Sequence, residues 1–97
     1  MNVVIDGRLV LDEADLHRRM AGAFGYGPCY RRDLDDLRRR LGAGDPRPVQ
    51  LVWTHSGSIR MALGVVAYET LVEALEQIEA GDAGLGWRDR FVFRLLE

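Results

Sequence analysis

Charged side chains are unevenly distributed along this sequence of 97 residues, and their arrangement suits the recognition of another charged surface. Residues 29–41 contain five arginines and three aspartates, whereas residues 66–82 contain five acids and no base. All thirteen cations are arginine, which codon bias in a GC-rich bacterial genome explains, so their number alone indicates no function. Separate basic and acidic regions favour an electrostatically steered protein partner over a nucleic acid, which would need one broad basic face.

The first of these regions has a structural interpretation as well as a functional one. Asp33, Asp35 and Asp36 are spaced to lie in the first turn of a helix. There Asp33 can accept from free backbone N–H groups, and all three carboxylates favour the positive end of the helix dipole. The arginines at 38–40 would lie in the last turn, where cations are favoured. Composition alone therefore favours a structural role for these six charges.

Residue types that could support catalysis or metal binding lack the patterns that such sites require. His55 and Ser56 could join an aspartate in a triad, but no nucleophile elbow or oxyanion glycine accompanies them. The glycines at 25 and 27, or at 84 and 86, lack the lysine and strand-to-helix context of a phosphate loop. Cys29 is the single cysteine, so no disulfide framework or metal-ligand cluster is predicted. We expect no enzymatic activity, metal ion or cofactor.

The bulk composition predicts a single globular domain over residues 1–97. Apolar residues make up 47% of the chain and charged residues 29%, which is ordinary for a folded domain. No apolar run approaches the roughly 18 residues that a membrane helix needs, and the first residues lack the features of a signal peptide. We therefore expect a cytoplasmic protein that binds no membrane, without an internal repeat, linker or low-complexity segment.

Apolar periodicity predicts the elements that must position the charged residues. The predicted strands are residues 2–5, 49–54 and 91–96. Residues 49–54 are apolar on nearly both faces, which indicates a central strand that is largely buried. The first predicted helix begins after Asp12, and the second begins after Asp33 and ends at Gly42. Two further helices are predicted at residues 56–63 and at about 67–80.

Strands that are separated by helical connections of this length are expected to be parallel, with right-handed crossovers. The sequence therefore predicts an α/β fold in which a three-stranded parallel sheet is covered by helices. The expected order is strand, helix, helix, strand, helix, helix, strand.

Residues 24–37, Phe-Gly-Tyr-Gly-Pro-Cys-Tyr-Arg-Arg-Asp-Leu-Asp-Asp-Leu, resemble the signature of the barstar family. In that signature a loop with an aromatic pair and a glycine leads into a helix that begins Asn-Leu-Asp-Ala-Leu. Ile5-Asp6-Gly7, Asp15-Leu16-His17 and Leu51-Val52-Trp53 also resemble the family, in the same order over residues 3–81. The resemblance implies an intracellular inhibitor of a secreted ribonuclease. Acids of the family's second helix, and of the loop before it, mimic RNA phosphate in the enzyme's active site.

The resemblance also assigns individual contacts. Asp35 matches a family acid that contacts the enzyme, and Tyr30 matches the second aromatic of the loop. Cys29 replaces the first aromatic, and Arg31 replaces a glycine, which adds charge and removes backbone freedom. Arg39 stands where ungapped comparison places the family's main phosphate-mimicking acid. A cation there would be repelled by a cationic phosphate site, so inhibition of barnase with the family's archetypal geometry is not expected.

Two explanations of Arg39 remain open at this stage. Another acid could perform the mimicry, Asp35 or Asp36 being nearest, or the partner's pocket could differ. Glu76 or its neighbour Gln77 matches a family contact, with a one-residue uncertainty in register. The expected partner-binding residues are Cys29, Tyr30, Arg31, Asp33, Asp35, Asp36, Arg38, Arg39 and Glu76.

Two functions follow as expectations. The first is an inhibitor, monomeric when free, that binds a secreted bacterial guanyl-specific ribonuclease 1:1 and blocks its active site by acidic phosphate mimicry. The second is an immunity or interaction protein for a different toxin, using the same scaffold with a mixed-charge surface, as in a toxin–antitoxin pair. The arginines at 31–32 and 38–40 motivate the second. Direct RNA binding is not expected, because three aspartates are interleaved with those arginines.

Overall fold

The computed structural model describes residues 1–26, 30, 33–44, 48–86 and 90–97. In chain order the elements are β1 (Asn2–Asp6), a 3-10 turn (Gly7–Leu9), α1 (Glu13–Phe24), α2 (Leu34–Arg39), a π-helical turn (Arg40–Gly44), β2 (Val49–Thr54), α3 (Ser56–Leu63), α4 (Val65–Gly81) and β3 (Phe91–Leu95). The predicted α/β order is confirmed, and β2 and α3 have the predicted bounds. The last long helix begins two residues earlier than predicted, directly after Gly64.

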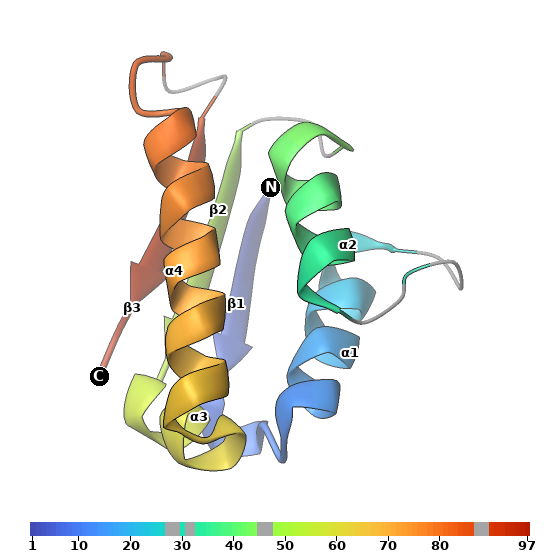
Figure 1. The fold of residues 1–97 in the computed structure, drawn as a ribbon, viewed down its shortest axis with the longest axis vertical. Coiled ribbons are helices and arrows are strands. Elements are labelled where there is room, and N and C mark those ends of the chain that lie inside the picture. The colour runs from blue at the N-terminus through green and yellow to red at the C-terminus, as the bar shows by residue number, and fades with distance from the viewer. Residues whose placement is uncertain (27–29, 31–32, 45–47, 87–89) are drawn as a thin grey trace.

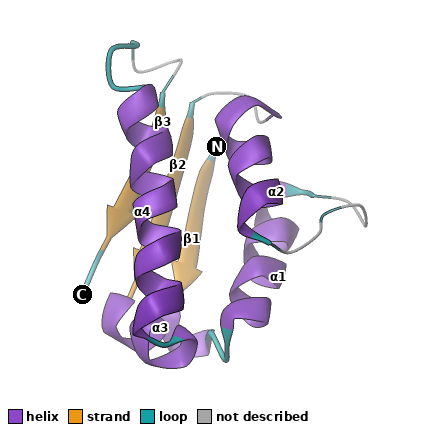
Figure 2. Cartoon of the chain, viewed as in Figure 1, coloured by secondary structure: helices purple, strands orange, loops and turns teal. Residues whose placement is uncertain are grey.

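The three strands form one parallel sheet in the order β1-β2-β3. The helices lie together in front of the strands in the view of Figure 2. Neighbouring strands follow one another across the sheet, so right-handed crossovers place both helix pairs on the same face. The expected parallel sheet is thus confirmed, with its helices gathered on one side (Figure 1).

Burial alternates along the strands, as one covered face requires. The buried strand residues are Val3, Ile5, Val49, Leu51, Trp53, Phe91 and Phe93. Val4, between two of them, is 62% exposed, and Gln50 and Val52 of β2 are only partly buried. The predicted central strand is confirmed, because β2 pairs with both other strands and alternates between buried and partly buried residues. In the part of the chain that the structure describes, the other face of β2 is not covered by a second layer of helices, because all the crossover connections lie on one side of the sheet.

The helices contribute the other half of the core. Leu16 and Met20 of α1, Leu37 of α2, and Leu71 and Leu75 of α4 are almost fully buried. Burial of each such side chain contributes about 2 kcal/mol. The Trp53 ring packs against Phe93 and Tyr68 at centroid distances of 5.0 and 6.5 Å.

Local sequence signals explain where α1 and α2 begin. Asp12 accepts a hydrogen bond from the Asp15 N–H at 2.8 Å, and Asp33 accepts from the Asp36 N–H at 2.8 Å. Both predicted N-caps are therefore confirmed. Beyond β1, a Cβ added to Gly7 would lie 2.4 Å from the Thr54 carbonyl oxygen, so only glycine allows this close approach. None of the helices among the described residues is long and apolar enough to cross a membrane.

Candidate protein-binding surface

Helix α2 presents both signs of charge at its surface. Asp33 and Asp35 are exposed at its start, and Arg38 and Arg39 are exposed toward its end. The structure thus places four of the predicted contact residues on one short helix. A helix of this composition can offer a carboxylate and a guanidinium to the same partner, about one turn apart.

Helix α4 lies beside α2 and extends this surface (Figure 1). Arg38 Nη2 donates to Gln77 Oε1 at 3.5 Å, and Gln77 Nε2 donates to Glu73 Oε1 at 3.4 Å. Glu73 is exposed. These contacts link a cation of α2 to an acid of α4, so we define the α2–α4 face as Asp33, Asp35, Arg38, Arg39, Glu73 and Gln77.

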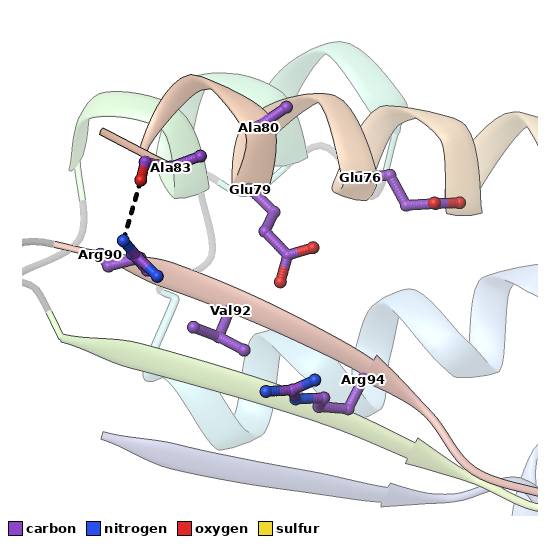
Figure 3. Close-up of a pocket in the computed structure, with 7 residues that line it drawn as sticks. All are labelled: Glu76, Glu79, Ala80, Ala83, Arg90, Val92 and Arg94. Carbon is purple, nitrogen blue, oxygen red and sulfur yellow. Dashed lines mark hydrogen bonds between the residues drawn. The ribbon is translucent and has the colours of Figure 1, made fainter. Parts of the chain in front are cut away.

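Glu76 lies on another side of α4. It lines a hollow of about 410 Å³ together with Glu79, Arg90 and Arg94, between α4 and the edge strand β3 (Figure 3). Gln77, the other residue that could match the family's contact, lies against α2 through Arg38. Glu79 accepts from the Phe93 N–H at 2.9 Å, so this acid is engaged in covering the sheet edge.

Asp36 does not belong to the exposed acids. It is 2% exposed, and it pairs with Arg39 and with Arg40, whose Nε lies 3.4 Å from Asp36 Oδ2. A buried carboxylate needs such pairing to offset its desolvation. The expectation that Asp36 could mimic phosphate at the surface is therefore corrected: the helix turns this side chain inward, and Asp35 is the exposed acid.

The same pairing changes the interpretation of Arg39. Its side chain is 68% exposed, but its guanidinium donates to the Asp36 carboxylate. The positive charge that replaces the family's acid is thus partly compensated within α2. Arg40 is more buried, and its guanidinium carbon lies 5.0 Å from the Tyr26 ring centroid and 5.6 Å from that of Tyr30. This is the geometry of a cation–π contact.

Tyr30 was expected to offer a stacking surface to the partner, and the structure corrects this. Tyr30 is 7% exposed, and a hydrogen bond of 2.7 Å joins its Oη to His17 Nδ1. Burial raises the pKa of the Tyr30 hydroxyl. This residue therefore anchors its loop to α1 rather than presenting its ring. The predicted contacts Cys29 and Arg31 lie outside the described residues.

His17 forms the other half of this buried contact. It is 1% exposed, and its Nε2 has no hydrogen-bond partner among the described residues, with Glu13 Oε1 3.7 Å away. Burial lowers the pKa of the His17 imidazole, although the Glu13 carboxylate opposes this. The neutral ring thus joins α1 to Tyr30 at neutral pH.

A short repeat, missed in the sequence, explains the buried acids. The pattern Asp-x-x-Asp-Leu-x-Arg-Arg occurs at residues 12–19 and again at 33–40. In the first copy Asp15 is 3% exposed and pairs with Arg18 and Arg19. Hydrogen bonds from Arg19 and from the Leu11 N–H lower the pKa of Asp15 to about 2. We call each arrangement of one buried aspartate and two arginines an Asp–Arg clamp. The expectation of no internal repeat was wrong for these eight residues.

The adjacent histidine and serine lie near different carboxylates. His55 Nδ1 lies 3.5 Å from Asp6 Oδ1 and 3.3 Å from Thr54 Oγ1, whereas Ser56 Oγ lies 3.5 Å from Glu97 Oε1. Within the described ranges, no group of three or more His, Cys, Asp and Glu side chains is arranged to hold a metal ion.

Comparison with known proteins places these features in a family. A family model described as Barstar (barnase inhibitor) matches residues 1–96. A search of curated proteins gives no match. The family match spans both Asp–Arg clamps and the whole α2–α4 face.

Proposed function

The chain belongs to the barstar family, a family of ribonuclease inhibitors, and we propose that it blocks the active site of a secreted bacterial guanyl-specific ribonuclease. The observation that carries this proposal is the exposure of Asp35 on α2 and of Glu73 on α4, while the neighbouring Asp36 is buried. An exposed carboxylate on a helix surface can occupy a site that is built of cations to hold a phosphate group.

The physical basis of inhibition is charge complementarity. A ribonuclease binds phosphate through cationic side chains, which form strong charge-assisted hydrogen bonds with carboxylates. Asp35 and Glu73 would occupy this site in place of the RNA backbone. The acidic side chains of α4 would also accelerate association at low ionic strength, because they attract the basic enzyme before contact.

This proposal gives the chain no chemistry of its own. It acts by binding, as a monomer in the free state and 1:1 with its partner, in the cytoplasm of the cell that secretes the enzyme. It binds neither nucleic acid nor membranes and requires no cofactor. Arg39 distinguishes its target from barnase, because the family's archetypal contact needs an acid at this position.

Calorimetry against a panel of secreted bacterial ribonucleases, with parallel activity assays, tests the proposal. We expect submicromolar binding to at least one enzyme and loss of its activity at equimolar inhibitor. Asp35→Asn should weaken that binding, whereas Glu69→Gln, an exposed acid of α4 outside the α2–α4 face, should not. Absence of submicromolar binding across the panel would contradict the proposal.

The exposed arginines favour one alternative, an immunity protein for a different toxin. Arg38 and Arg39 lie on the same surface as Asp35, so the α2–α4 face suits a partner that carries both acids and bases. The variant Arg39→Asp separates the two functions. If it creates or strengthens ribonuclease binding, the natural target is a different protein. A toxin gene beside the gene for this chain would identify that target.

A further inference from the structure

An apolar groove lies next to the α2–α4 face. It has a volume of about 520 Å³ and is open to solvent between the first half of α4 and the starts of α1 and α2. Its lining residues are Glu13, Leu34, Leu63, Gly64, Val65, Val66, Ala67, Thr70 and Leu71. Among these lining residues only Glu13 is charged, so the groove offers mainly hydrocarbon surface.

The corner between α3 and α4 leaves several large apolar side chains in water. Met61 is 87% exposed, Val66 is 80% exposed and Val65 is 48% exposed. Residues 61–68 contain no charged residue. Val65 and Val66 both line the groove, and exposed apolar side chains that gather in one place are characteristic of an interaction site. These exposed side chains do not contribute to the buried core of the protein.

The groove is continuous with the charged surface along one side of α4. Val66, Thr70, Glu73 and Gln77 are spaced by four, three and four residues, which aligns them on the side of α4 that faces α2. Gln77 contacts Arg38, and Thr70 lines the groove with Leu34, the first residue of α2. Thr70 and Gln77 are about 10 Å apart along the helix. A single protein partner can therefore cover both.

Charge determines which partner fits. Glu13 lines the groove, and Asp35 and Glu73 are exposed on α2 and α4, two helices that also line it. A second copy of this chain would bring the same acids against them, and like charges across an interface are unfavourable. An apolar side chain on a basic protein surface satisfies both the hydrocarbon lining and the acidic surroundings.

We propose that this groove receives an apolar side chain of the same protein whose cationic site binds Asp35 and Glu73. The inference rests on the proposed function and deepens it, because it adds an uncharged anchor to the charged contact. Such an anchor is desolvated on binding and is expected to control dissociation, whereas exposed charges mainly control association. The target would then be selected by the spacing between its apolar residue and its phosphate-binding cations.

The groove can be tested without knowledge of the target. In an NMR titration of the methyl-labelled chain with N-acetyl-L-leucine methylamide, we expect saturable shifts of the Leu63, Val65, Val66 and Leu71 methyl groups. Val66→Ser should weaken this binding at least threefold, by roughly the loss of an apolar contact. Val4→Ser, at the 62%-exposed residue of β1, is the matched control and should change nothing. Shifts that do not saturate, or that spread to Val4, would overturn the groove as a binding site.

The second arm uses any ribonuclease that the calorimetric panel identifies. Val65→Ser/Val66→Ser should weaken its binding by about tenfold, through faster dissociation and with an unchanged salt dependence, whereas Asp35→Asn should reduce the salt dependence. If the enzyme binds the unchanged chain and the Val65→Ser/Val66→Ser variant equally, the inference is wrong and the proposed function stands. If no ribonuclease binds but the leucine probe occupies the groove, the ribonuclease target is wrong, and the result supports the groove as an apolar docking site.

Discussion

The starts of α1 and α2 are built from the same eight-residue pattern but carry out different tasks. In each, an aspartate caps the helix, and the aspartate three residues later is buried and held by two arginines. Leu16 and Leu37, which follow the buried acids, are both fully buried. The Asp–Arg clamp is therefore a device that fixes the beginning of a helix on the core, and it is used twice.

The two segments differ at the positions outside the clamp. Ala14 of α1 corresponds to Asp35 of α2, and both are exposed. His17 is buried against Tyr30, whereas its counterpart Arg38 is exposed and reaches α4. Arg39 corresponds to Arg18, which also pairs with a buried aspartate. The comparison gives Arg39 a structural role, and it leaves Asp35 and Arg38 as the exposed residues of α2 that we propose contact a partner.

Removal of the buried acids should have the largest effect on stability. Asp15→Ala and Asp36→Ala each leave two arginines without their carboxylate, so we expect a loss of about 2–3 kcal/mol in the free energy of unfolding. Urea denaturation measures this loss, with Asp35→Ala as the exposed control. If Asp36→Ala costs no more than the control, the second clamp is not structural and the comparison fails.

The buried histidine should make stability depend on pH. The folded-state pKa of His17 is lowered by burial, so the unfolded chain binds more protons than the folded chain as pH falls below about 6.5. Stability should then decrease from pH 7 to pH 5, by at most about 1.4 kcal/mol per pH unit for one proton. His17→Gln should flatten this pH profile. An equal slope in His17→Gln and in the unchanged chain would contradict this role.

Ala14 and Asp35 are exposed residues that differ between the two copies of the pattern, and substitutions at these positions should distinguish effects on partner affinity from effects on stability. Asp35→Ala gives α2 the residue that α1 has, and we expect ribonuclease affinity to fall at least about tenfold, or about 1.4 kcal/mol. Stability should change by no more than about 0.5 kcal/mol. Ala14→Asp places the same acid on α1 and should leave affinity unchanged, as calorimetry would show. A gain of affinity in Ala14→Asp as large as the loss in Asp35→Ala would mean that net charge, and not the place of the acid, controls binding.

The exposed arginines of the Asp–Arg clamps should contribute least to the free energy of unfolding. Arg18→Gln and Arg39→Gln each remove one of two guanidinium groups from a buried aspartate, and both side chains are more than half exposed. We therefore expect each to cost less than about 1 kcal/mol, because solvent screens the pair and the second arginine remains. Thermal unfolding at low and high salt measures both. A cost at Arg39 well above that at Arg18 would show that the two clamps are not equivalent.

Local signals in the sequence were sufficient for most of the fold. Capping aspartates at 12 and 33, and alternating or continuous apolar runs, act within a few residues, so strand and helix positions follow from neighbours along the chain. The boundary of α4 was less well predicted, because Val65 and Val66 are exposed and give no periodic signal.

What the sequence by itself determined about this protein is its element order, the starts of α1 and α2 and the clustering of its charges. Only the tertiary structure decided which charges face outward. Asp35 and Asp36 are adjacent and chemically identical, yet one is exposed and one is buried, because the rotation of α2 against the core turns only one inward. The packing of α4 beside α2 likewise brought Gln77 into contact with Arg38, since a neighbour across two helices depends on how they dock and not on spacing along either one.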